Sequence, residues 1–180
     1  MSEPKKTAII VGAGHRALTY AFYAQHHPEQ LQIVGVADPT PLRREQTAAR
    51  FGLEPGQCHV SAEALALLPR QADFIINGTM DHQHVQTALP LLRRGYHMLL
   101  EKPFATSEDD LWALVAKVRQ HQNKVAICHV LRHAPFYAAI RQLVAEGAIG
   151  QVLNIQAVEH VSYHHMAVGF IRGKWSRIDY

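Results

Sequence analysis

The segment that most constrains the fold is residues 7–17, Thr-Ala-Ile-Ile-Val-Gly-Ala-Gly-His-Arg-Ala, in which an apolar run leads through two glycines into a helical pattern. A junction of strand, glycines and helix is typical of dinucleotide-binding folds. Gly12 would allow the tight turn, Gly14 would let backbone N–H groups approach a pyrophosphate, and Ala17 would let the helix pack on the strand. The positive end of the helix dipole would then face the phosphates.

A second apolar run, residues 31–37, ends in Asp38. Its distance from the glycines is the one expected for the acid that accepts hydrogen bonds from the adenosine ribose. A carboxylate there accepts from a free 2′-hydroxyl and repels a 2′-phosphate, which favours NAD. Arg43 and Arg44 follow closely, and because arginine near the second strand is the usual device for NADP, that cofactor stays possible. The alternative is that the glycines and Asp38 form ordinary turns.

Composition limits the size and the partners of the protein. The 180 residues, 48% hydrophobic and 18% charged, are enough for one domain with a full core and short for two. The net charge of +3 is spread along the chain without a Lys/Arg block, so we expect neither nucleic acid nor a membrane surface as a partner. Cys58 and Cys128 lie far apart and fit no metal or disulfide motif, so we expect reduced, buried thiols. With no apolar run long enough for a signal peptide or membrane span, a cytoplasmic location is predicted.

Strand and helix patterns alternate along most of the chain. The predicted strands are residues 7–11, 31–37, 58–60, 73–77, 97–100 and 125–130, and the predicted helices are residues 15–27, 41–51, 61–68, 82–94 and 108–122. This order with short loops predicts an α/β fold, with a doubly wound, mostly parallel Rossmann-type sheet over residues 1–130.

The pattern changes after residue 130. Pro135 begins a predicted helix that runs to Glu146 and stops at Gly147. Residues 152–161 then alternate between apolar and polar side chains, which predicts a half-buried strand that needs partner strands. We therefore expect residues 131–180 to begin a second α/β domain that is incomplete in this chain.

The triplet Glu101-Lys102-Pro103 follows the predicted fifth strand at its carboxyl end, where open α/β sheets bind their ligands. Lys102 could donate a proton to, or pair with, a substrate oxygen near a nicotinamide. Glu101 could orient Lys102 or hold a cofactor hydroxyl. From spacing alone, a surface ion pair is an equally good interpretation.

Several motifs together resemble one known family. They are Gly12-Ala-Gly14-His15-Arg16-Ala17, Ala37-Asp38-Pro39, Gly78-Thr79-Met-Asp-His-Gln-His84, Gly95-Tyr-His-Met-Leu-Leu-Glu101-Lys102-Pro103 and Glu146-Gly-Ala-Ile-Gly150. The glycine motif is shared by many dehydrogenases, but Glu-Lys-Pro followed by the Gly-Ala-Ile-Gly turn is specific. On these residues the chain resembles the Gfo/Idh/MocA oxidoreductases.

The resemblance implies an N-terminal NAD(P)-binding domain, a second domain whose open sheet carries the substrate, and homo-oligomers. The implied reaction is hydride transfer between the nicotinamide and a sugar or polyol hydroxyl carbon. Lys102 is implied to be catalytic, while His84, at the start of a helix, could be structural. The implied cofactor-binding residues are Gly12, Gly14, His15, Arg16, Ala17, Asp38, Thr79, His84, Glu101 and Lys102. Family members are much longer, and their catalytic Asp-x-x-x-His pair lies beyond Tyr180, so we expect a truncated member that could bind nucleotide without turnover.

Two alternatives to a simple dehydrogenase stay open. Residues 159–166 and 170–175 look like a subgroup that includes NAD-dependent glycosidases, which implies oxidation of a sugar hydroxyl, elimination, water addition and re-reduction with NAD recycled. A non-catalytic protein that senses NAD is the other alternative.

A cluster of polar residues ends the chain. Tyr163 and His164 could be acid/base groups of a substrate site or simply exposed. Glu159 and the histidines at 160, 164 and 165 could be taken for metal ligands. Neighbouring residues of an extended strand point to opposite faces, however, and no second ligand group has a recognisable spacing, so we predict no metal site.

Overall fold

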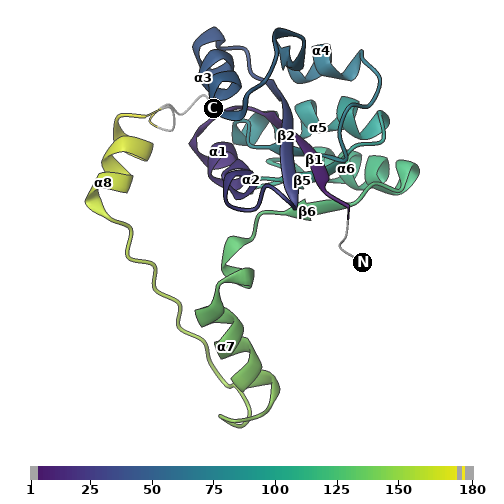
Figure 1. The fold of residues 1–180 in the computed structure, drawn as a ribbon. Coiled ribbons are helices and arrows are strands. Elements are labelled where there is room, and N and C mark those ends of the chain that lie inside the picture. Colours follow the sequence, from purple (N-terminus) through teal and green to yellow (C-terminus); the bar gives the residue numbers. More distant parts are fainter. Residues whose placement is uncertain (1–3, 174–175, 177–180) are drawn as a thin grey trace. The chain divides into compact units, whose positions relative to one another are not determined.

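A six-stranded parallel sheet forms the centre of the first part of the chain (Figure 1). The computed structural model describes residues 4–173 and 176, and the chain divides after residue 129 into two units, each described here by itself. The strands are β1 Lys6–Val11, β2 Leu31–Ala37, β3 Cys58–His59, β4 Phe74–Asn77, β5 His97–Leu100 and β6 Val125–Ile127. Their order is β3-β2-β1-β4-β5-β6, and every neighbouring pair is parallel. The predicted doubly wound sheet is confirmed.

Helices cover the sheet in two groups. They are α1 His15–Ala21, α2 Tyr23–His26, α3 Pro41–Phe51, α4 Ala62–Ala66, α5 His84–Arg93 and α6 Glu108–His121. One buried cluster joins Ile9 and Ile75 to residues of α4, α5 and α6, and the other joins Ile10 and Ile76 to α1. Because alternate residues of β1 and β4 enter different clusters, the two groups of helices lie on opposite faces of the sheet.

Local signals set several element boundaries where the sequence predicted them. Gly52 ends α3 in the left-handed region, with φ 65°. The Ser61 and Ser107 hydroxyls accept hydrogen bonds from the third residue beyond, at the starts of α4 and α6. The predicted helix over residues 15–27 divides at Phe22, and α5 begins later than predicted because Asp81 opens a 3₁₀ turn, Asp81–Gln83.

The chain after residue 129 contains helical segments and no strand among its described residues. These are a 3₁₀ turn Val130–His133, α7 Pro135–Ala145, α8 Tyr163–His165 and a π-helical segment Met166–Ile171. The predicted helix from Pro135 and its stop at Gly147, with φ 71°, are confirmed. The predicted strand over residues 152–161 is wrong. A strand needs a neighbour for its N–H and C=O groups, and none of the described strands pairs with this exposed segment.

None of the helices in residues 4–173 is long and apolar enough to cross a membrane.

Candidate functional site

The two glycines of the first loop have different surroundings. Gly12 has φ 75°, and a Cβ added to it would lie 2.8 Å from the backbone N and Cα of Thr79. Nearby, a Cβ added to Gly78 would lie 2.8 Å from the Cβ of Ala17. The loop after β4 therefore lies directly against the glycine loop and α1, and side chains are excluded at both contacts.

Gly14, unlike Gly12, has free space around it. A Cβ added to Gly14 would have no described atom within 4 Å. Gly14 is the N-cap of α1, and no side chain in the described part of the chain caps this helix end. The first backbone N–H groups of a helix have no partner within it, so those of α1 are free to meet an anion. The loop thus fits the pyrophosphate of a dinucleotide.

Asp38, after β2, fixes the same loop from the other side. Its carboxylate is 2% exposed; Oδ2 accepts from the backbone N–H of Ala13 at 2.8 Å, and Oδ1 accepts from that of Thr40 at 2.8 Å. Arg43 approaches Oδ2 only to 3.7 Å, and Arg44 donates to the Asp38 carbonyl at 2.6 Å. Asp38 therefore shapes the glycine loop in addition to any contact with a ribose.

A buried carboxylate joins α1 to the end of β5. Glu101 is 6% exposed, and its Oε1 accepts a 2.5 Å hydrogen bond from the Tyr20 hydroxyl, with the Nε of Arg16 at 3.4 Å. Its Oε2 accepts from the backbone N–H of Lys102 at 2.7 Å. Burial and the Glu101 contact raise the pKa of Tyr20, so the phenol keeps its proton and donates. Glu101 thus orients Lys102 through the backbone.

Lys102 is exposed just beyond this carboxylate. Within residues 4–173, its ammonium makes no hydrogen bond or ion pair. It lies near Asp81, whose pKa is raised, chiefly by burial, although the charge of Lys102 opposes the rise. Lys102 therefore presents an exposed cation at the carboxyl end of the strands, where α/β sheets bind ligands.

Two buried polar residues organise the loop between β4 and α5. The Oδ1 of Asn77 accepts from the N–H and hydroxyl of Thr79, at 3.3 and 2.9 Å, and its Nδ2 donates to the Thr87 hydroxyl at 3.0 Å. His84 is fully buried, with Nδ1 2.6 Å from the Pro103 carbonyl and Nε2 3.1 Å from the Thr79 carbonyl. The predicted site residues Thr79 and His84 thus lie in one network, in which both ring nitrogens of His84 face protein carbonyls.

Sequence reasoning missed Tyr20 and Asn77. A signal existed for each, since Tyr20 lies four residues after Arg16 on one face of a helix, and Asn77 is the polar residue that ends an apolar strand. The partner of Tyr20 was not visible, because Glu101 follows another strand. Asn77 reaches Thr87 only once α5 packs beside β4.

Cys128 lies beside the same carboxylate. Both cysteines are free thiols; Cys128 is buried as predicted, whereas Cys58 is only partly buried. Burial raises the pKa of the Cys128 thiol to about 11, and the thiol interacts with Tyr20 and Glu101. Since the thiolate is the reactive form, Cys128 is an inert neighbour of the site.

The remaining predicted site residues lie outside these networks. His15 is exposed, and its carbonyl accepts from the Thr19 hydroxyl. Tyr163 and His164 belong to the second unit, where both are exposed in the short helix α8. Because that segment is helical, the strand argument about neighbouring histidines was wrong. No three His, Cys, Asp or Glu side chains in residues 4–173 are placed to hold a metal. Lys174 and Trp175 lie outside the described residues.

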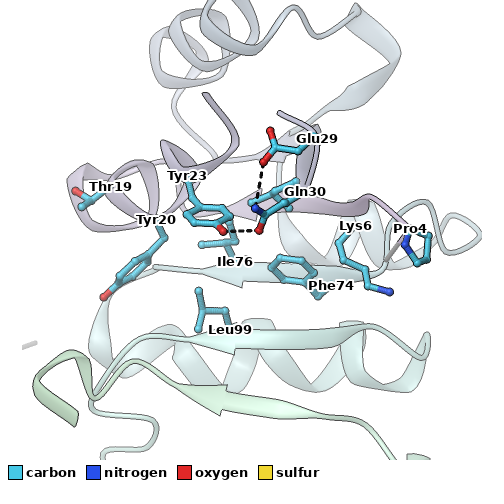
Figure 2. A pocket seen from close by; sticks show the side chains of 11 residues that line it. Pro4, Lys6, Thr19, Tyr20, Tyr23, Glu29, Gln30, Phe74, Ile76 and Leu99 are labelled. Carbon is cyan, nitrogen blue, oxygen red and sulfur yellow. Dashed lines mark hydrogen bonds between the residues drawn. The ribbon is translucent and has the colours of Figure 1, made fainter. Parts of the chain in front are cut away.

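Two cavities lie near these elements. One, of about 880 Å³, is floored by Phe74, Ile76 and Leu99 and bordered by α1 and α2, as Figure 2 shows. None of the predicted cofactor-binding residues is among the described residues that line it. The other, of about 510 Å³, is lined in part by Ala13 and Arg43, so it borders the glycine loop.

The sheet order, the open glycine loop at the switch between β1 and β4, and the acid after β2 define a dinucleotide-binding α/β domain of the Rossmann type. Comparison with family models identifies the class further: residues 6–129 match the oxidoreductase family with NAD-binding Rossmann fold, GFO_IDH_MocA. The chain belongs to this family. Its resemblance to Gfo/Idh/MocA oxidoreductases and the predicted NAD-binding domain are confirmed.

Similar proteins are mostly dehydrogenases and reductases. The putative oxidoreductase YteT of Bacillus subtilis is 26% identical over 96% of this chain and 41% of its own length. The 1,5-anhydro-D-fructose reductase of Ensifer adhaerens is 32% identical over 73% of the chain and 38% of its own length. Inositol 2-dehydrogenase 4 of Saccharopolyspora erythraea is 28% identical over 85% of this chain and 45% of its own length. The chain thus spans less than half the length of these relatives.

Solved structures show the same fold. The WlbA dehydrogenase of Bordetella pertussis, in complex with NADH and UDP-GlcNAcA, matches with a TM-score of 0.75 at 19% identity, over 82% of this chain and 44% of that one. The apo scyllo-inositol dehydrogenase of Lactobacillus casei matches with a TM-score of 0.77 at 19% identity, over 84% and 44%.

Proposed function

We propose that this chain is the NAD-binding part of an oxidoreductase that transfers hydride between the nicotinamide and a sugar or polyol hydroxyl carbon. The observation that carries the proposal is the pairing, at the carboxyl end of the strands of one sheet, of an open Gly14 loop and the exposed ammonium of Lys102. Relatives named for inositol and for 1,5-anhydro-D-fructose support the substrate class.

The glycine loop, Asp38 and Lys102 have separate roles in this proposal. The backbone N–H groups after Gly14 hold the pyrophosphate, and Asp38 accepts from the adenosine ribose with the lone pairs that the loop leaves free. NAD, when bound, supplies the hydride acceptor or donor. Lys102 donates a hydrogen bond to the substrate oxygen and stabilises the negative charge that the oxygen carries after its proton passes to an acid/base group and before hydride leaves the carbon.

The surroundings of Asp38 favour NAD over NADP. Its carboxylate repels a 2′-phosphate, and Arg44 already donates to the Asp38 carbonyl. Arg43 is a cation that could reach such a phosphate, since it approaches the carboxylate only to 3.7 Å. We therefore expect weaker binding of NADP.

Turnover needs more than this chain under the same proposal. Residues 131–180 begin a second α/β domain that carries substrate in a longer, homo-oligomeric cytoplasmic protein, where Tyr163 and His164 supply acid/base groups. The 180-residue chain is then sufficient to bind cofactor.

Calorimetric titration of Gly14→Ala with NAD and NADP tests the cofactor part. An added Cβ at Gly14 meets open space in the protein, so the fold should persist while the methyl group obstructs the phosphate. We expect NAD affinity to fall about tenfold or more, which corresponds to about 1.4 kcal/mol.

Gly56→Ala is the matched control, because a Cβ there also meets no described atom within 4 Å and Gly56 lies in a distant 3₁₀ turn, Pro55–Gln57. It should change neither the melting temperature nor NAD affinity. Equal NAD affinity of Gly14→Ala and the unaltered chain would overturn the assignment of the loop, as would a folded chain that binds neither nucleotide.

A further inference from the structure

The ring of His84 connects the two loops that the proposed reaction must hold together. Its Nε2 faces the carbonyl of Thr79, whose backbone packs on Gly12, and its Nδ1 faces the carbonyl of Pro103, directly after Lys102. The ring has no solvent exposure. The His84 side chain therefore connects the loop that packs on Gly12 to the turn that carries Lys102.

Both partners of this ring are acceptors, which restricts how it can bond. A carbonyl only accepts, whereas a neutral imidazole has one N–H donor and one acceptor nitrogen. The neutral ring can therefore bond only one of the two carbonyls. The Nδ1 contact is the closer one, at 2.6 Å against 3.1 Å, so the geometry favours the proton on Nδ1.

We infer that His84 is a positioning residue whose Nδ1–H donates to the Pro103 carbonyl and so holds the Lys102 turn against the β4–α5 loop. The role given to Lys102 rests on the proposed function, but the bond itself does not. In this neutral tautomer Nε2 carries no proton, so it lies near the Thr79 carbonyl without donating to it. Asp81 interacts electrostatically with His84 and also with Glu101, Lys102 and His82.

Two substitutions separate the contacts of the ring. The amide nitrogen of asparagine lies as many bonds from Cα as Nδ1 does, so His84→Asn keeps a donor toward Pro103. The amide nitrogen of glutamine matches Nε2 in the same way, so His84→Gln keeps a donor only toward Thr79. Loss of one hydrogen bond is worth about 1 kcal/mol, or roughly fivefold in an opening equilibrium.

Long-range proton–nitrogen NMR on the unaltered chain, at a pH where the ring is neutral, tests the tautomer without any nucleotide. A protonated Nδ1 with an unprotonated Nε2 is expected at His84, and the reverse pattern would overturn the inference. Because this measurement needs neither a variant nor cofactor binding, its outcome is independent of the proposed function.

Amide hydrogen exchange then tests the positioning role. The Lys102 N–H, which donates to Glu101, is the reporter. In His84→Gln we expect its exchange to rise about fivefold, whereas His84→Asn should stay within about twofold of the unaltered chain. Equal exchange in the two variants would show that His84 only fills space. If either variant fails to fold, the NMR result on the unaltered chain still decides.

Discussion

The loops in the two halves of the candidate site are held by different kinds of contact. In the half formed by β1 and β2, close backbone contact at Gly12 and one buried carboxylate, Asp38, fix the loop. In the half formed by β4 and β5, side chains such as His84 and Glu101 hold the loops by hydrogen bonds. The first half thus combines close backbone contact with one buried carboxylate, whereas the second rests on several side-chain hydrogen bonds, which predicts different responses to substitution.

Gly12→Ala should give the largest effect. The new Cβ would lie 2.8 Å from backbone atoms of Thr79, and φ 75° disfavours any side chain. Left-handed backbone costs about 1–2 kcal/mol and overpacking about 1–3 kcal/mol, so we expect a loss of about 3 kcal/mol in the free energy of unfolding, measured with denaturant.

Gly52→Ala isolates the backbone term, since Gly52 has φ 65° and no described atom near an added Cβ. It should lose only about 1 kcal/mol. Equal losses at the two positions would mean that contact with Thr79 does not define the first half of the site.

Asp38→Asn should come next. One carboxylate oxygen becomes an amide that faces a backbone N–H, either at Ala13 or at Thr40, so a buried donor loses its acceptor. The expected loss is about 2 kcal/mol, measured by the same unfolding experiment. A variant as stable as the unaltered chain would show that the carboxylate does not hold the loop and serves only a ligand.

Tyr20→Phe probes the second half with a smaller expected effect. It removes the hydroxyl that donates to Glu101, and we expect a loss of about 1 kcal/mol by denaturant unfolding. Tyr23→Phe is the matched control one turn further along, because Tyr23 is exposed and its hydroxyl donates to the exposed Gln30. If both variants lost the same stability, hydrogen bonding to Glu101 would not distinguish this half.

Asp73 precedes β4, at the end of the sheet away from the candidate site. Its substitution should have the smallest effect on stability, and that effect should depend on pH. Hydrogen bonding from the Thr7 backbone N–H lowers the pKa of its carboxyl, so the charged form stabilises the fold above the ordinary carboxyl pKa. Asp73→Asn should cost under about 1 kcal/mol at neutral pH, because the side chain is half exposed.

The difference between Asp73→Asn and the unaltered chain should shrink as the pH falls through the lowered pKa, where the stabilising charge is lost. Melting temperatures of both proteins at neutral and acidic pH test this. A difference that grows in acid would contradict the assigned direction of the pKa shift.

Sequence reasoning succeeded where a signal and its effect are close in the chain. Gly52 ends a helix through its own backbone angle, and Ser107 caps the helix that begins beside it. The fold class followed because alternating strands and helices have few arrangements. The strand over residues 152–161 failed for a related reason, since alternation records which face could be buried and says nothing about a partner strand.

The connections within the site could not be read from the sequence in the same way. His84 meets Pro103 and Glu101 meets Tyr20 only because β4 lies between β1 and β5. That adjacency is a product of the whole sheet. Tyr20 carries no local feature that predicts Glu101 as its partner, so its place in the site became visible only with the fold.

The Asp38 carboxylate both accepts from the glycine loop and faces the proposed ribose site, which has a consequence for any change of cofactor. A substitution of Asp38 that removes its negative charge to accommodate a 2′-phosphate also alters the group that accepts from the Ala13 amide. Nucleotide preference and loop geometry are therefore coupled through one side chain, and a variant that changes the first needs another acceptor for the Ala13 amide. Arg43 and Arg44 would help such a change only after that acceptor exists.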